Sequence, residues 1–314
     1  MSSRASAALH VTNGDAVVYL FKKAGILGTH LPWRDVLHEG PVPGDLTLEE
    51  CSRVRGAYLA SRGHGKPIKV MHDFQSRDAT IRKAKDFSEV VLWFEHDLYD
   101  QLQMLQVLTV LDDMKLEPGT VSIVHSDNYL GSMTADEIVE LHPKRRTVTA
   151  AVFARARAVW SAFTSDDPMA LHATACEDHP GFPHLRAGLR RLCEEYPWTS
   201  DGMSRSHRHA LSAVAQGAAK DEELFRRAQA REEAPFLGDT TFYAILNDLR
   251  AESGALIEGE PGLTALTELG RRIVAGDGDW LESVELERWI GGVHLEGKSA
   301  PRYDEVSQKF QYVK

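Results

Sequence analysis

The sequence predicts an α/β protein in three parts: a mostly parallel open-sheet domain over residues 1–141, a helical connector over 142–199 and a winged-helix-like α+β domain over 200–314. Two observations lead to this prediction. In the first part, short apolar runs of strand length alternate with helical stripes, which is typical of a parallel sheet covered by helices on both faces. The apolar spacing then becomes helical throughout the connector, before three further helices and two short strands.

The elements of the first part follow from apolar spacing. Strands are predicted at 7–12, 29–33, 90–94 and 120–124, and helices at 16–24, 48–60, 78–85, 98–114 and 134–141. The clearest strand is the continuous apolar run Val90–Phe94, and the clearest helix carries leucines at helical spacing from Leu98 to Leu111. Gly25 is expected to end the first helix.

The rest of the chain reads as mainly helical. The connector carries two apolar stripes, at 152–163 and 185–196, with breaks at 166–168 and 180–183. Helices follow at 204–216, 221–233 and 240–252, then strands at 255–260 and 263–266 around a turn at Pro261-Gly262, and a helix capped by Thr267. This is the order of a winged helix-turn-helix. Its recognition helix, 240–252, holds little basic charge, so packing or dimerisation is favoured over DNA reading.

The C-terminal tail contains two consecutive glycines, Gly291 and Gly292, between Trp289 and His294. The favoured interpretation is a packed tail anchored by Trp289. The alternative is that the glycines let the tail approach the surface of another domain.

Composition excludes several classes of protein. The chain holds 36 Lys and Arg against 46 Asp and Glu, a formal net charge of −10 that argues against DNA as a partner. With no apolar run of spanning length and no secretory signal, we expect no membrane partner and a cytoplasmic location. The three cysteines, Cys51, Cys176 and Cys193, lack metal-ligand spacing and are expected to be reduced core thiols. Homo-oligomerisation is left open.

Polar residues gather where the predicted strands end, which is where open α/β sheets bind ligands. The candidate catalytic residues are Glu95, His96 and Asp97. The candidate substrate-binding residues are His10, Asn13, Asp15, Trp33, Arg34, His38, Glu39 and Gln101. Serine hydrolase, P-loop and dinucleotide motifs are absent from the sequence, and Ser204 is expected to be a helix N-cap.

The residue types suggest roles. Glu95-His96-Asp97 directly follows a buried apolar run, so these side chains must leave the sheet, and a histidine oriented by a carboxylate can transfer protons near neutral pH. Arg34 can hold an anion, with Trp33 as a stacking wall. Carboxylates and imidazoles can also ligate a divalent metal, and that cofactor is left open.

Each candidate also has a structural alternative. Asn13 or Asp15 can cap a helix, and Arg34 can form a salt bridge to a neighbouring acid such as Asp35. Asp97 can be the N-cap of the helix that follows, with His96 as a buried histidine.

Three motifs carry a family resemblance: His10–Asp15 (HVTNGD), Trp33–Pro41 (WRDVLHEGP) and Leu92–Leu102 (LWFEHDLYDQL). Together with segments 231–239 and 288–295, they resemble the bacterial domain-of-unknown-function 1835 family over nearly the whole chain. One departure is the short segment 128–132, where members of that family carry a longer loop. The resemblance implies kinship and supplies no activity.

The sequence therefore predicts an enzyme that acts on a small anionic substrate, a nucleotide or another phosphorylated metabolite, by acid–base hydrolysis or group transfer. In this hypothesis His96 transfers the proton and Arg34 holds the anion. One alternative is a ligand-responsive regulator that binds DNA through its C-terminal part. The other is a non-catalytic interaction protein whose polar strand ends are merely capped and paired.

Overall fold

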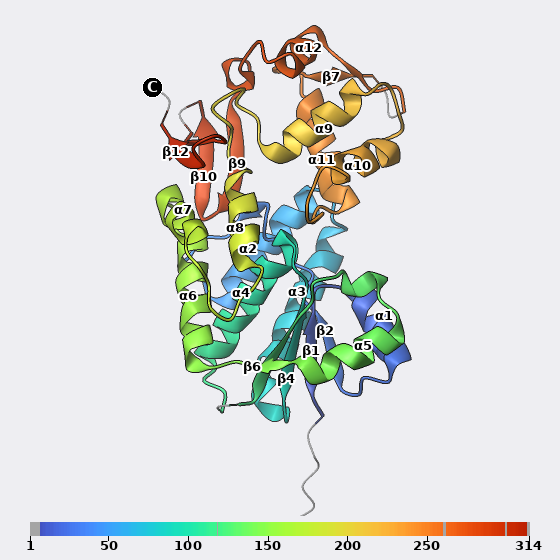
Figure 1. Cartoon of the computed structure of the whole chain (residues 1–314), viewed down its shortest axis with the longest axis vertical. Helices are drawn as coiled ribbons and strands as arrows, with labels where there is room; N and C mark the ends of the chain where they lie inside the picture. The colour runs from blue at the N-terminus through green and yellow to red at the C-terminus, as the bar shows by residue number, and fades with distance from the viewer. Residues whose placement is uncertain (1–6, 118, 260–261, 299, 313–314) are drawn as a thin grey trace, which may run out of the picture.

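A five-stranded sheet forms the centre of the N-terminal part of the computed structural model, which describes residues 7–117, 119–259, 262–298 and 300–312 (Figure 1). The strand order is β2-β1-β4-β5-β6. The strands are β1 (Leu9–Thr12), β2 (Thr29–Pro32), β4 (Val90–Phe94), β5 (Val121–His125) and β6 (Arg146–Thr147). The first four are mutually parallel and β6 is antiparallel, which confirms the predicted α/β class with a mostly parallel sheet.

Helices cover both faces of this sheet, as its apolar strands require. Alternate residues of β4 point to opposite faces, so Val91 and Trp93 pack beneath α1 (Asp15–Ala24) and α5 (Ala135–Leu141). The other residues of β4 pack with α4 (Leu98–Asp113), α6 (Ala150–Thr164) and α3 (Pro67–Ile81). Figure 1 shows these two helical layers on either side of the strands.

Helix α3, in the first part of the chain, and strand β6, in the segment predicted as a helical connector, differ from the prediction. Helix α3 occupies Pro67–Ile81, whereas the sequence predicted a helix over 78–85. The two ranges share only residues 78–81. Its buried apolar residues are sparse, which leaves no dense apolar stripe in the sequence. Strand β6 is exposed and two residues long, so it has no apolar signature. Sparse or absent apolar periodicity is the physical reason that both were missed.

The connector and C-terminal part are mainly helical. The remaining helices are α2 (Leu48–Ser61), α7 (Pro168–Cys176), α8 (Leu185–Cys193), α9 (Arg205–Ala215), α10 (Asp221–Gln229), α11 (Asp239–Arg250) and α12 (Glu268–Val274). The single-turn 3₁₀ helices are η1 (Ala84–Asp86), η2 (Leu130–Ser132), η3 (His142–Lys144) and η4 (Trp280–Glu282). No helix within the described ranges combines the length and apolar character needed to cross a bilayer.

The short strands of the C-terminal part form three groups. Strands β7 (Ile257–Glu258) and β8 (Ala265–Leu266) pair antiparallel between α11 and α12, and the predicted turn at Pro261 lies outside the described residues. Strands β9 (Leu286–Gly291) and β10 (Val293–Gly297) form the second group, which also takes in β3 (Gly40–Pro41) of the N-terminal part, and β11 (Arg302–Asp304) pairs with β12 (Lys309–Gln311) in the third. Ser204 and Thr267 cap α9 and α12, as predicted.

Helix α11 is packed against the N-terminal part of the chain. The Thr241 hydroxyl donates to Glu39 Oε1 at 3.1 Å, and the Arg62 guanidinium binds both oxygens of Asp248 at 3.2 and 2.9 Å. The helix predicted to resemble a recognition helix therefore has an intramolecular partner.

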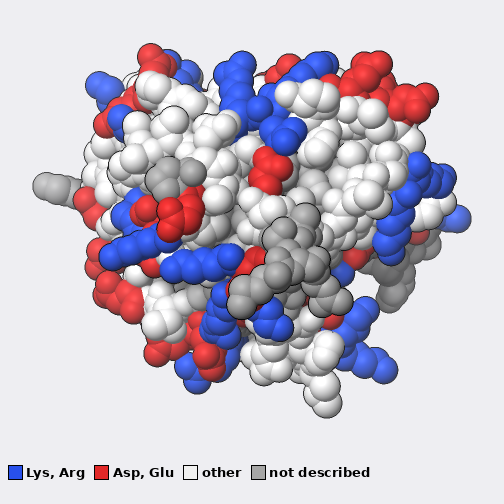
Figure 2. Space-filling model, turned by 90° about the horizontal axis from the view of Figure 1, so that it is seen from below, with Lys and Arg blue, Asp and Glu red and all other residues white. Residues whose placement is uncertain are grey.

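Figure 2 shows acidic and basic side chains intermingled over the lower face of the molecule.

The cysteines fall into two groups. Cys51 and Cys193 are buried, as predicted. Cys176 is exposed, so the expectation of a third core thiol was wrong. Cys176 is the last residue of α7, where the helix turns its end toward solvent.

The tail joins the N-terminal part through a small second sheet. Strand β9 pairs with β10 on one side and runs parallel to β3 on the other, with Gly40 opposite Ile290. Trp289 stacks on His294 at 4.4 Å between ring centroids. The tail is packed, with Ile290, Val293 and Leu295 buried, as the favoured interpretation predicted, and its glycines also lie against other segments of the chain.

Gly291 and Gly292 make this approach sterically feasible. A Cβ atom on Gly292 would lie 2.0 Å from the carbonyl oxygen of Thr164, and one on Gly291 would lie 2.1 Å from that of Phe163. Both carbonyls belong to the C-terminal end of α6. Any side chain at either position would push the tail away from α6 and from β3.

We predict that Gly292→Ala lowers the free energy of unfolding by about 3 kcal/mol, because the added methyl group overlaps the Thr164 carbonyl. Urea denaturation followed by circular dichroism measures the change. Gly238→Ala is the matched control, since its added methyl group meets no atom within 4 Å and its φ of −79° suits alanine. We expect the control to cost less than about 1 kcal/mol. Equal losses in the two variants would contradict the steric argument.

Candidate functional site

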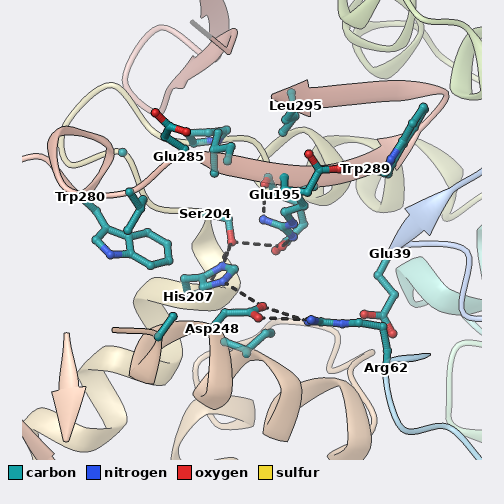
Figure 3. A pocket seen from close by; sticks show the side chains of 18 of the residues that line it. Glu39, Arg62, Glu195, Ser204, His207, Asp248, Trp280, Glu285, Trp289 and Leu295 are labelled. Atoms are coloured by element: carbon teal, nitrogen blue, oxygen red, sulfur yellow. Dashed lines mark hydrogen bonds and ion pairs between the residues drawn. The ribbon is translucent and has the colours of Figure 1, made fainter. Parts of the chain in front are cut away.

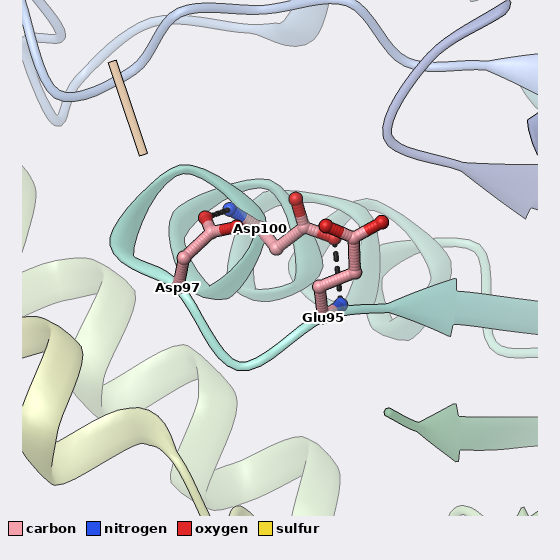
Figure 4. A group of neighbouring side chains, drawn as sticks. All are labelled: Glu95, Asp97 and Asp100. Carbon is pink, nitrogen blue, oxygen red and sulfur yellow. Dashed lines mark hydrogen bonds between the residues drawn. The ribbon is translucent and has the colours of Figure 1, made fainter. Parts of the chain in front are cut away.

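Three carboxylates meet at the carboxyl end of the parallel sheet: those of Glu95, Asp97 and Asp100 (Figure 4). One oxygen from each lies within 4.8 Å of the others, and all three side chains are buried. Glu95 and Asp97 are predicted site residues. Asp100 was missed, because an aspartate inside the first turn of a helix usually faces solvent. Its spacing of one turn from Asp97 is the signal that could have identified it.

The ends of two strands and a helix hold these carboxylates in place. Asp97 is the N-cap of α4 and accepts the backbone N–H of Asp100 at 3.1 Å. Asp100 accepts the backbone N–H of Glu95 at 2.7 Å and the side-chain amide of Asn13, which follows β1, at 2.9 Å. Glu95 accepts the backbone N–H of Leu130 at 2.7 Å. Every carboxylate is thus oriented by at least one donor.

Burial raises the pKa of all three groups, and the charges of neighbouring carboxylates raise it further at Asp97 and Asp100. Burial raises the pKa of Asp97 to about 7, and the charge of Glu95 adds to the effect. Burial and then the charges of Asp97 and Glu95 hold the pKa of Asp100 well above its usual value. Burial also raises the pKa of Glu95. Three carboxylates this close together repel one another when all are ionised. They are therefore stable here only if some of them carry a proton or if a cation lies between them.

Arg34 and Asp15 form an exposed ion pair beside this cluster. Arg34 Nε and Nη2 donate to the two oxygens of Asp15 at 2.8 and 2.5 Å. A positive φ of 54° at Arg34 turns its side chain out while its two neighbours point inward. Arg34 does form a salt bridge, but its partner is Asp15 and not Asp35. The pair lies at the N-terminus of α1, whose N-cap residue Gly14 provides no side-chain hydrogen bond.

Trp33 and Asp35 are buried and serve the fold. Trp33 Nε1 donates to Gln106 Oε1 at 2.6 Å, so its indole is a core group and the expected stacking wall is not available. Asp35 accepts Arg55 Nε at 2.9 Å, and both side chains are fully buried. These contacts fix the start of the segment that follows β2.

Arg55 also organises the segment from Val36 to Pro41. Its guanidinium donates to the carbonyl oxygens of Val36 at 2.6 Å and Glu39 at 2.7 Å. Arg55 therefore holds the backbone of this segment from the protein core. The side chains of His38 and Glu39 lie on the opposite side of the segment from Arg55, away from the carboxylate cluster. The sequence placed these two residues in one crevice with Glu95, whereas they line a separate cavity.

Three other predicted residues lie around the cluster or away from it. Gln101 is buried and donates to the backbone oxygen of Glu95 at 2.6 Å, so it positions the strand end. His96 packs its ring 4.9 Å from that of Tyr129. His10 lies under α1 and α5, where it accepts the Trp93 indole N–H at 3.1 Å. Burial lowers the pKa of His10 to about 4, and its ring lies with Val17, Phe21 and Trp93 on the α1 and α5 side of the sheet.

A cavity of about 900 Å³ separates the C-terminal part from the N-terminal part (Figure 3). Its walls come from all three predicted parts: the segment after β2 with α2, the end of α8, and α9, α11 and β9. Ser204, His207 and Asp248 form a polar row on one wall, with Ser204 Oγ 2.8 Å from His207 Nδ1 and His207 Nε2 3.9 Å from Asp248 Oδ2.

The hydrogen bonds of Ser204 in this polar row hold the wall of the cavity together. Ser204 is buried, caps α9 by accepting the His207 backbone N–H at 3.3 Å, and donates to Glu195 Oε2 at 3.2 Å. The Ser204 hydroxyl therefore shares its hydrogen bonds among the backbone N–H and ring of His207 and the carboxylate of Glu195. The cap interpretation of Ser204 is therefore confirmed.

Compared with known proteins, the chain matches no protein-family model and no curated protein. The predicted kinship with the domain-of-unknown-function 1835 family therefore stays a prediction.

We predict that Asp35→Asn lowers the free energy of unfolding by about 3–5 kcal/mol, because it leaves the buried Arg55 charge without its partner. Asp15→Asn, which breaks the exposed pair with Arg34, is the matched comparison and should cost less than about 1 kcal/mol. Urea titration of the two variants measures both changes. Similar losses would show that the segment after β2 does not depend on its buried ion pair.

Proposed function

We propose that this chain is an enzyme that uses a divalent cation, held by Glu95, Asp97 and Asp100, to hydrolyse or transfer a phosphoryl group of a small phosphorylated metabolite. The observation that carries the proposal is the approach of three buried carboxylates within 4.8 Å of one another at the end of β4. Carboxylate oxygens are the ligands that Mg²⁺ and Mn²⁺ prefer. Open α/β sheets bind their ligands at this edge.

The charge of the cluster decides between a cation and a bare anion site. An anionic substrate and three carboxylates repel each other unless a positive charge lies between them. A bound divalent cation would supply that charge, polarise a phosphoryl oxygen and lower the pKa of a water. The need for such a cation reconciles an acidic cluster with the anionic substrate predicted from the sequence.

The start of α1 provides a subsite for the phosphate. This ten-residue helix begins at Asp15, directly after β1, and its N-cap residue Gly14 leaves the first backbone N–H groups without a side-chain partner. An added Cβ on Gly14 would meet no atom within 4 Å, so the backbone is open there. Helix N-termini favour anions, and a phosphate here would compete with the exposed Asp15 carboxylate for the Arg34 guanidinium.

His96 is the proton-transfer group in this proposal. It lies between Glu95 and Asp97 in sequence, and its buried Nδ1 makes no hydrogen bond with any described residue. Asn13 and Gln101 are positioning residues, because they hold Asp100 and the Glu95 backbone. A DNA-binding regulator has less support, since α11 is engaged with Glu39 and Arg62.

We predict that Mn²⁺ binds the wild-type chain and that Glu95→Gln and Asp100→Asn each weaken binding at least about tenfold, because each removes one anionic ligand. Electron paramagnetic resonance of free Mn²⁺ measures binding without any substrate. Asp127→Asn, an exposed acid after β5, is the control and should bind as the wild type does. Wild-type binding in all three variants, or no binding at all, would overturn the metal site.

Activity is tested with p-nitrophenyl phosphate, bis(p-nitrophenyl) phosphate and nucleoside 5′-phosphates, with Mn²⁺ and with a chelator. We expect turnover that depends on the metal, and a loss of about 10²–10⁴-fold in His96→Gln at unchanged Mn²⁺ affinity. Turnover that survives in both Glu95→Gln and His96→Gln would contradict the assignment of this centre.

A further inference from the structure

The cavity between the three parts of the chain is lined by more acidic than basic side chains, so its charge does not suit an anionic ligand. Five carboxylates line it against three Lys or Arg side chains. Two of the three bases are already neutralised, since Arg62 binds Asp248 at 2.9 Å and Arg288 binds Glu195 at 2.7 Å. The surplus charge of the walls is therefore negative. A phosphate would find no uncommitted guanidinium among the described lining residues.

His38 is the buried group in this cavity that lacks a partner. Its side chain is 3% exposed, and neither ring nitrogen makes a hydrogen bond within the described part of the chain. The ring is held edge-on by Phe236 at 4.9 Å between centroids. Burial lowers the pKa of His38 to about 4, so the ring is neutral near pH 7 and keeps one nitrogen lone pair. A buried imidazole of this kind calls for a hydrogen-bonding ligand.

Glu39 places a carboxylate next to this imidazole. Its Oε1 accepts His64 Nε2 at 2.9 Å and the Thr241 hydroxyl at 3.1 Å. Burial alone would raise the pKa of Glu39, but the hydrogen bond from His64 and the nearby charges outweigh it and lower the pKa, so the group is ionised. Tyr58, Trp280 and Trp289 supply aromatic surface to the same cavity. Aromatic faces and a carboxylate together favour a cation.

We propose that this cavity binds a small organic cation, an amine on an apolar ring or chain, with its ammonium group held by Glu39 and His38. The carboxylate of Glu39 provides the charge, and the lone pair of His38 accepts an N–H from the ammonium. The apolar body lies along the aromatic walls, and about 900 Å³ is ample for a metabolite of this class. The site is separate from the carboxylate cluster and does not depend on the proposed metal.

The test uses three probes that share an indole body and differ in charge: tryptamine, tryptophol and indole-3-acetate. Isothermal titration calorimetry on the full chain at pH 7 gives their affinities. We expect tryptamine to bind about tenfold more tightly than tryptophol, and indole-3-acetate to bind most weakly, because only the ammonium pairs with Glu39. This order is measured on the wild-type protein and needs no variant to fold.

Variants then locate the anchor. Glu39→Gln keeps an oxygen for Thr241 and should reduce tryptamine affinity about tenfold while leaving tryptophol unchanged. Glu49→Gln, an exposed acid on α2 outside the cavity, should bind both probes as the wild type does. Equal affinities for the three probes, tightest binding of indole-3-acetate, or no binding at millimolar concentration would overturn the proposal. Mn²⁺ binding in Glu39→Gln should stay at the wild-type value, which separates this site from the metal site.

Discussion

The pairing of β9 with β3 is the contact on which the arrangement of the molecule depends. Strand β3 belongs to the segment that follows β2, and β9 belongs to the C-terminal tail. One short parallel pair therefore joins the N-terminal part of the chain to the tail. The pair forms only because Gly291 and Gly292 let the tail lie against the carbonyl groups at the end of α6. This contact brings β9, which lines one wall of the cavity, against the segment that carries His38 and Glu39.

Buried ion pairs fix the orientation of the parts that this contact brings together. Arg55 binds Asp35 inside the N-terminal part, and Glu195 binds both Arg191 in the connector and Arg288 on β9. Burial alone would raise the pKa of Glu195, but these two arginines hold it well below its usual value. A buried pair contributes little net stability against an apolar pair of similar shape, and its strict geometry specifies orientation. These pairs therefore preorganise the walls of the cavity.

The parts of the fold that the sequence predicted are those with strong apolar periodicity. Val90–Phe94 matches β4, and the leucine stripe from Leu98 matches α4, because burial on a sheet demands those patterns. Helix α3 and the β3–β9 pair could not be predicted in the same way. The first buries few apolar groups, and the second depends on backbone approach between segments that are distant in sequence.

The candidate site was predicted as one crevice, and the structure divides it in two. Strand ends meet at one edge of a sheet, which explains why Asn13 and Glu95 come together. The sequence carries no signal for the hydrogen bonds from Arg55 to the backbone of the segment after Asp35. These bonds turn that segment, with His38 and Glu39, away from the edge of the sheet. Asp100 was missed because a helical aspartate has no signature of burial.

The segment after β2 supplies residues to both sites, and its conformation separates their chemistry. Arg34, with its positive φ, turns toward the start of α1, while His38 and Glu39 turn into the cavity. Tyr99 stands between the two, with its ring 6.0 Å from His38 and its hydroxyl donating to the Asn13 carbonyl at 3.4 Å. In the two proposals, helix amides and a guanidinium now paired with Asp15 would select an anion on one side, whereas a carboxylate and a neutral imidazole would select a cation on the other. Since Arg55 holds the segment rigidly, each site can discriminate by charge without weakening the other.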